Sequence, residues 1–159
     1  MKKLLIVLVA IAFLTTAAFA GSTDTQTVYY EIDAINEIAM DADLTLTVNA
    51  ADAGSEPNMD LDNSQTYDIT TNTTAGKKIT VAINANMPAN TTLIANMIAP
   101  TGGSTGGAKN LTTTAQDAVT SIETVAESGV EYNLTLTATV AAGLPADGSR
   151  VITFTLTDS

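Results

Sequence analysis

The chain has 159 residues, of which 45% are hydrophobic and 14% charged, and it contains no cysteine, histidine or tryptophan. Without cysteine it is not a disulfide scaffold, and without histidine it lacks the usual general base near neutral pH and the commonest metal ligand. Its 6 basic and 17 acidic residues give a net charge of −11, which repels nucleic acid and anionic lipid surfaces. We therefore expect neither an enzyme nor a nucleic-acid-binding protein.

The first twenty residues have the three parts of a secretory signal peptide. Lys2 and Lys3 precede an uncharged run over 4–14, which is shorter than the roughly 20 residues of a bilayer span. Ala18 and Ala20 then supply the small residues of a cleavage site before Gly21. We predict a signal peptide over 1–20 and a secreted, extracellular or cell-surface protein whose single domain spans 21–159 and has no membrane span.

An alternating segment follows the predicted cleavage site. Residues 21–26 are small and polar, and residues 27–34 then alternate, which places Val28, Tyr30, Ile32 and Ala34 on one apolar face. Such a strand either pairs within its own sandwich or enters a groove of a neighbouring subunit as a donor strand, here residues 21–35. In the second case these four side chains form the subunit interface.

The rest of the chain alternates threonine with aliphatic residues at a period of two. The runs are 44–48, 79–83, 134–140 and 152–157, with weaker ones at 67–69 and 93–98. Turn-forming residues separate them at 52–58, 72–77, 86–90, 100–107 and 142–148. The pattern predicts an all-β fold, an antiparallel β-sandwich of the Ig-like or pilin-like kind with about seven to nine strands. A short helix within 114–125 is an alternative to a strand over 119–125.

The same alternation predicts which side chains form the core. They are Leu44, Leu46, Val48, Ile79, Val81, Ile83, Leu134, Leu136, Ile152, Phe154 and Leu156. The glycine-rich stretch 101–107 is expected to be a flexible surface loop, because the Gly-Lys-Ser/Thr ending of a phosphate loop is missing where Asn110 follows Lys109.

Acidic residues gather in two places that suggest calcium. Glu56, Asp60 and Asp62 form one group, and Asp41 and Asp43 form another. The spacing of an EF-hand fails, because the required glycine and glutamate are replaced by Gln65 and Thr71. We expect a solvated polar loop and no cofactor, with a calcium site as the weaker alternative.

The combination of a signal peptide, an alternating N-terminal strand, a Thr/Ala/Gly-rich body and a closing strand over 151–157 resembles the small secreted β-sandwich subunits of bacterial surface fibres, the fimbrial and spore-coat-protein-U-like proteins. The resemblance implies a structural subunit of a fibre, coat or matrix, which self-associates into a homopolymer by strand exchange. A monomeric secreted adhesion or ligand-binding module is the alternative. Such a module presents aromatic residues in loops, and the five aromatics beyond the signal all fall in expected strands.

Overall fold

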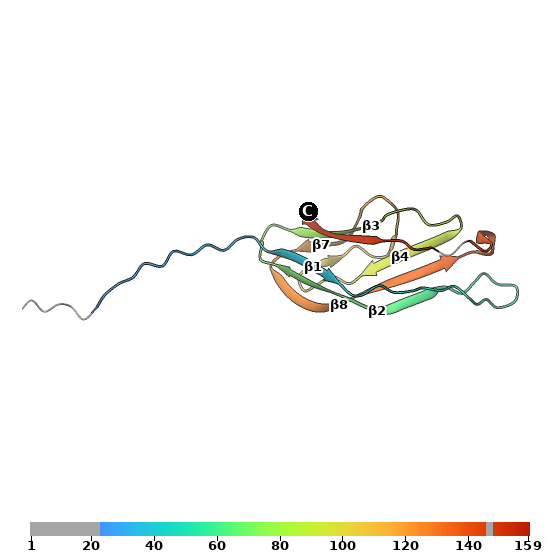
Figure 1. The fold of residues 1–159 in the computed structure, drawn as a ribbon, viewed down its shortest axis with the longest axis horizontal. Coiled ribbons are helices and arrows are strands. Elements are labelled where there is room, and N and C mark those ends of the chain that lie inside the picture. The colour runs from blue at the N-terminus through green and yellow to red at the C-terminus, as the bar shows by residue number, and fades with distance from the viewer. Residues whose placement is uncertain (1–22, 146–147) are drawn as a thin grey trace, which may run out of the picture. The chain divides into compact units, whose positions relative to one another are not determined.

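The structure is a computed structural model that describes residues 23–145 and 148–159 (Figure 1). The predicted signal peptide, 1–20, lies outside the described residues. The chain forms two compact units, a short N-terminal one that ends at Ile32 and a larger one, Asp33–Ser159. The strands all belong to the larger unit, which is referred to below as the sandwich.

The sandwich consists of two antiparallel sheets that pack against each other, which confirms the predicted fold class (Figure 1). The first sheet has the order β1 (Asn36–Met40), β2 (Asp60–Thr71), β8 (Val125–Ala138), β4 (Thr91–Met97) and β6 (Lys109–Asn110). The second has the order β5 (Ser104–Thr105), β7 (Gln116–Ile122), β3 (Lys77–Ile83) and β9 (Ile152–Asp158). β1 and β9 are therefore edge strands of facing sheets.

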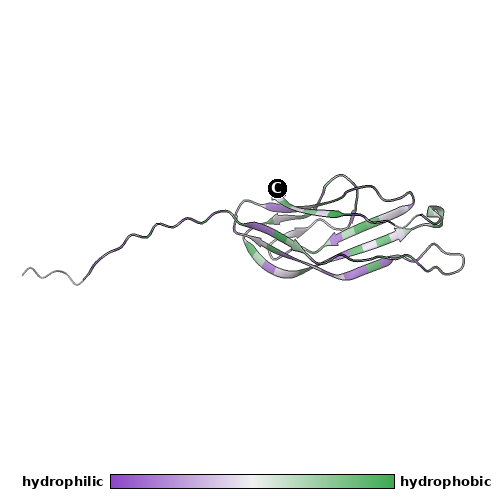
Figure 2. Ribbon diagram, in the orientation of Figure 1, coloured by the Kyte–Doolittle hydropathy of each residue, from purple (hydrophilic) through white to green (hydrophobic). Residues whose placement is uncertain are grey.

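The core forms because alternate residues of each strand point between the sheets. Ile79, Val81 and Ile83 of β3 are buried against β4, β8 and β7, whose inner faces are equally apolar. Figure 2 shows the resulting bands of hydrophobic and hydrophilic residues along the strands. Burial of each large aliphatic side chain contributes about 1.5–3 kcal/mol, so the period-two pattern is also the main source of stability.

Two of the predicted elements differ in the structure. Residues 44–48 belong to no strand, although Leu44, Leu46 and Val48 still alternate as half-buried positions with exposed neighbours. The region 114–125 contains β7 and the start of β8 rather than a helix. The one helical element of the described residues is a 3-10 turn, Val140–Ala142.

The glycine-rich stretch 101–107 is also more ordered than predicted. It contributes β5, which pairs with β7, and the Gly106 N–H donates to the Ala118 carbonyl at 2.7 Å. A Cβ at Gly106 would lie 2.6 Å from the Asp117 carbonyl oxygen, closer than any side chain tolerates. Gly106 therefore lets this segment approach the backbone of β7, which a flexible loop would not require.

Candidate interaction site between the sheet edges

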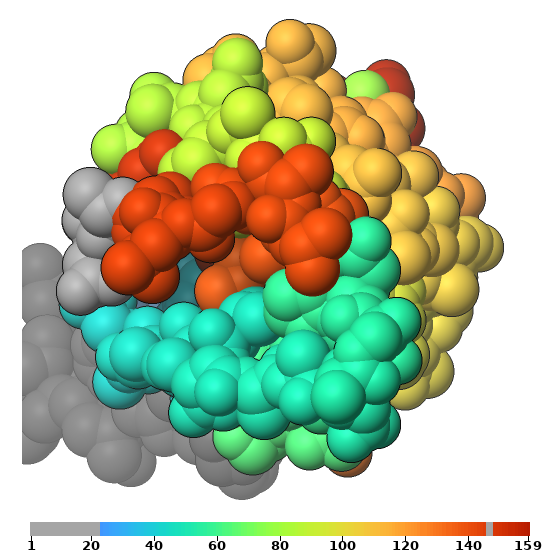
Figure 3. Space-filling model, turned by 90° about the vertical axis from the view of Figure 1, so that its right-hand side faces the viewer, coloured from blue at the N-terminus to red at the C-terminus, as the bar shows by residue number. Residues whose placement is uncertain are grey.

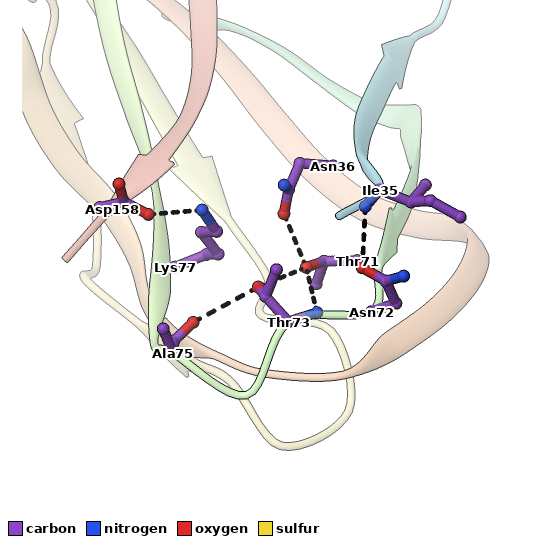
Figure 4. A network of polar contacts seen from close by, with 8 residues as sticks. All are labelled: Ile35, Asn36, Thr71, Asn72, Thr73, Ala75, Lys77 and Asp158. Carbon is purple, nitrogen blue, oxygen red and sulfur yellow. Dashed lines mark hydrogen bonds and ion pairs between the residues drawn. The ribbon is translucent and has the colours of Figure 1, made fainter. Parts of the chain in front are cut away.

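The chain enters the sandwich at an anchor formed by Asn72 (Figure 4). The Asn72 side-chain amide donates to the Asp33 carbonyl and accepts the Ile35 N–H, each at 2.8 Å. The Asn72 N–H donates to the Ile35 carbonyl at 3.2 Å. The side chain thus binds Asp33 and Ile35 in the way a neighbouring strand would, and it holds the start of β1 extended.

Other polar contacts mark the same end of the sandwich. Thr71 Oγ1 donates to Asn36 Oδ1 at 2.8 Å, and Lys77 forms an ion pair with Asp158 (Figure 4). The Ser159 N–H donates to the Gly76 carbonyl. The entry point of the chain and the end of β9 therefore share one end of the sandwich.

The four predicted interface residues fall on both sides of this anchor. Val28, Tyr30 and Ile32 belong to no strand and are 73%, 86% and 76% exposed. Ala34 lies between the two residues that Asn72 holds, and it is exposed as well. If residues before Asp33 act as a donor segment, the C-terminal end of that segment is held at Asp33 by the hydrogen bond from Asn72.

A cleft opens between the two sheets toward the other end of the sandwich, and its lining is mainly apolar but includes Asp41, Asp43 and Arg150. One wall is the segment 41–50 that follows β1, and the other is the segment 148–154 that leads into β9. Its inner part has a volume of about 580 Å³, and it continues past Leu46, Met87 and Leu136 into an outer part of about 1040 Å³. Figure 3 views this end and shows the hollow between the segments near residues 45–60 and 138–145.

The predicted core residues that remain half-buried lie around this cleft. Ile79, Val81, Ile83 and Leu134 are buried as predicted. The other seven are half-buried: Leu44, Leu46, Ile152, Phe154 and Leu156 still pack against the buried core, as predicted, and the remaining two are Val48 and Leu136. All of these except Leu156 line the cleft. The reason is that the two edges are separated here, so the inward side chains lack cover on one side.

The open edge of β9 forms one side of the cleft and carries backbone groups without a strand partner. The Asn84 N–H donates to the Val151 carbonyl, and Ser159 bonds Gly76, so in the antiparallel register the odd-numbered residues of β9 bond β3. The N–H and C=O groups of Ile152, Phe154 and Leu156 then point away from β3. Among the described residues β9 pairs with β3 alone, so this edge is available for another strand.

Four of the five acidic residues considered for calcium accept backbone N–H groups, and Asp41 accepts that of Thr66. Glu56 accepts the Val140 N–H at 2.6 Å, and Asp60 accepts the Thr47 N–H. Asp62 accepts the N–H and the hydroxyl of Ser64, each at 2.9 Å, and these hydrogen bonds lower the pKa of Asp62. Within 23–145 and 148–159, no three acidic side chains lie where they could hold a metal ion together.

Comparison with known families and curated proteins assigns no role to the cleft. The chain matches no protein-family model and no curated protein. In the described part of the chain, no helix has the length and apolar character needed to cross a membrane. The resemblance to fimbrial and spore-coat-protein-U-like subunits therefore remains a proposal.

Two buried tyrosines of the core predict how stability depends on pH. Burial raises the pKa of both Tyr67 and Tyr132, and the nearby Glu127 adds to the effect at Tyr67. A pKa that is higher in the folded state means that the protonated tyrosines stabilise the fold. This stabilisation is fully present below the ordinary tyrosine pKa of 10.0, and it is lost as pH rises through the raised pKa values. We expect the free energy of unfolding in urea to fall progressively above pH 10.

Tyr67→Phe separates this effect from general charge repulsion. The Tyr67 hydroxyl donates to the Ile98 carbonyl at 2.7 Å, so its removal should cost about 1 kcal/mol at pH 7. The variant should also lose less stability than the parent protein above pH 10. An identical alkaline decline in the two proteins would show that Tyr67 ionisation does not contribute.

Proposed function

We propose that this protein is a structural subunit of an extracellular or cell-surface fibre, coat or matrix, and that its subunits assemble by strand exchange. One observation carries the proposal. The segment 27–34 has the apolar alternation of a core strand but belongs to no strand, while the sandwich leaves part of its core uncovered beside an open strand edge. The segment lacks a strand partner and cover for its apolar face, and the sandwich has an open strand edge and an uncovered apolar surface. This complementarity favours assembly between subunits.

The remaining support comes from the sequence. The predicted signal peptide directs the protein out of the cytoplasm, and the mature chain has no cysteine to stabilise it by disulfides. An exported sandwich with an incompletely covered core gains stability when a neighbour covers that core. In such a subunit, self-association and stability are the function.

A ligand-binding module is the second candidate, and the cleft itself is the observation that favours it. Its inner volume of about 580 Å³ lies within the usual range for small-molecule sites. In that case the cleft would take an apolar ligand and the protein would remain a monomer. The two candidates therefore differ in oligomeric state.

Sedimentation velocity and electron microscopy of the purified mature protein test the proposal. We expect concentration-dependent oligomers that extend into filaments. A single monomeric species at all concentrations, with particles of uniform size in the microscope, would contradict strand exchange and favour the binding module.

Salt should promote assembly. Removal of Lys2 and Lys3 with the signal peptide leaves 4 basic and 17 acidic residues, a net charge of −13, so neighbouring subunits repel one another. Raising the ionic strength from about 0.01 M to 0.1 M shortens the screening length from about 30 Å to 10 Å. We expect a larger polymer fraction at the higher ionic strength by sedimentation. Dissociation by salt would mean that ion pairs, rather than burial of apolar side chains, hold the subunits together.

A further inference from the structure

We infer that the cleft beside β9 is the acceptor site for a second copy of this chain, whose residues 24–32 add to the open edge of β9 as an antiparallel strand. The inference rests on the proposed function, because it states where the exchanged strand binds and in which direction. The occupant, the edge and the orientation each follow from the described residues.

The cleft has the two features that an added strand needs. The N–H and C=O groups of Ile152, Phe154 and Leu156 face the open edge and offer a ladder of hydrogen bonds. Apolar side chains from both walls, from β4 and from β8 line the space next to that edge. They include Leu44, Leu46, Leu93, Leu136 and Phe154. A strand placed there would bury its inward side chains against the uncovered part of the core.

The N-terminal segment matches this site in pattern and length. Val28, Tyr30 and Ile32 recur at the spacing of two that puts side chains on one face of a strand, as do Ile152, Phe154 and Leu156 in β9. The polar Glu31 would then face solvent. The nine residues 24–32 reach about 30 Å when extended, whereas the seven residues of β9 span about 23 Å.

The two ends of the sandwich set the orientation. Asn72, which binds Asp33, lies at the end of the sandwich where β9 finishes at Asp158 (Figure 4). The cleft is lined by Pro57 and Val140 toward the opposite end. A segment that extends from Asp33 into the cleft of the next subunit links the copies head to tail, and such heterologous contacts form an open-ended polymer. Ile32 then lies at the cleft mouth and Val28 deeper, which makes the added strand antiparallel to β9.

Exposed apolar residues surround the mouth where the next subunit would arrive. Val140, Leu144 and Val151 all line the cleft, and they are 65%, 100% and 61% exposed. Large apolar side chains gathered at one surface are characteristic of protein interfaces. The mouth of the cleft therefore offers a further contact surface beyond the added strand itself.

The anchor favours a second copy over insertion into the same molecule's cleft. To enter its own cleft, the chain would have to reverse direction close to Asp33. Asn72 holds Asp33 and Ile35 extended, so a reversal at this point would have to break the hydrogen bonds of the anchor. Exchange between copies needs no such reversal.

Disulfide cross-linking of the full mature chain tests the inference, because the protein has no cysteine of its own. Thr155→Cys places a thiol on the exposed outer face of β9. A second preparation carries a thiol on the outer face of the donor segment, at Thr27, Tyr29 or Glu31 in turn. The two preparations are mixed, assembled and oxidised, and linked dimers are measured on a non-reducing gel. Directly opposite residues of antiparallel strands are close enough to react.

Two matched controls define the expected result. Tyr30→Cys puts the donor thiol on the inner face, and Thr70→Cys puts the acceptor thiol on an exposed position of β2 instead of β9. At least one outer donor position should cross-link to Thr155→Cys about tenfold more than either control pair, since only opposite residues approach closely. The chain that carries both that donor cysteine and Thr155→Cys should form a ladder of linked oligomers.

The other outcomes overturn the inference in distinguishable ways. If polymers form but Thr155→Cys cross-links no better than Thr70→Cys, the acceptor lies elsewhere, and the proposed function survives. If the double variant forms an internally linked monomer, the segment fills its own cleft. If every preparation remains monomeric and no linked species forms, the proposed function fails together with the acceptor site.

Discussion

Ile32→Asp is expected to abolish assembly of the mature protein while the sandwich stays folded. Ile32 precedes the anchored residue Asp33 and lies outside the sandwich unit, so its replacement removes no contact of the described core. In the assembled state the new carboxylate would lose hydration at the cleft mouth, against the apolar side chains of Val140, Leu144 and Val151, at a cost of several kcal/mol. A cost of about 3 kcal/mol weakens association more than a hundredfold.

Tyr29→Asp is the matched control, because it introduces the same charge in the same segment but on the opposite face. Sedimentation velocity should show polymers for Tyr29→Asp and monomers for Ile32→Asp. At concentrations too low for assembly, the two variants should have equal urea unfolding midpoints. If both variants assemble, or if neither does, the face formed by Val28, Tyr30 and Ile32 is not the interface.

A pair of leucine substitutions on one strand tests whether the cleft is open in solution. Leu134 and Leu136 lie on the same face of β8, but Leu134 is only 4% exposed whereas Leu136 is half-buried at the cleft. Leu134→Ala should lower the free energy of unfolding by about 2–5 kcal/mol, the usual range for a buried leucine. Leu136→Ala should cost only about 1 kcal/mol in the monomer, because less of its surface leaves water on folding.

Both leucine variants are best measured by urea unfolding in the Ile32→Asp background, which keeps the protein monomeric. With Ile32 restored, Leu136→Ala should also weaken assembly, since Leu136 faces the proposed added strand. Equal losses of stability for the two variants would mean that Leu136 is as buried as Leu134 in the monomer and that the cleft is closed.

Alternation along the sequence predicted the sandwich well because the period of two determines which side chains face the core. It predicted the buried faces of β3 and β8 at Ile79, Val81 and Leu134. It failed over 44–48 because a strand also needs a backbone partner, which alternation does not specify. There the Thr47 N–H bonds the side chain of Asp60 rather than a neighbouring strand.

The candidate site could be predicted only in part. The face formed by Val28, Tyr30 and Ile32 is visible in the sequence, whereas its acceptor depends on contacts between distant residues. Asn72 follows a strand and resembles an ordinary turn residue, and only the fold brings it to Asp33. The cleft likewise becomes visible only where predicted core residues, such as Phe154, turn out to be half-covered.

Residue-resolved amide hydrogen exchange in β9 tests the acceptor site most directly. In the Ile32→Asp monomer, the amides of Thr153, Thr155 and Thr157 should be protected by their bonds to β3, whereas those of Ile152, Phe154 and Leu156 should exchange rapidly. In the polymer, we expect the second set to become protected about a hundredfold or more by the added strand. If those three amides still exchange rapidly in the polymer, the segment of the second copy does not bind β9.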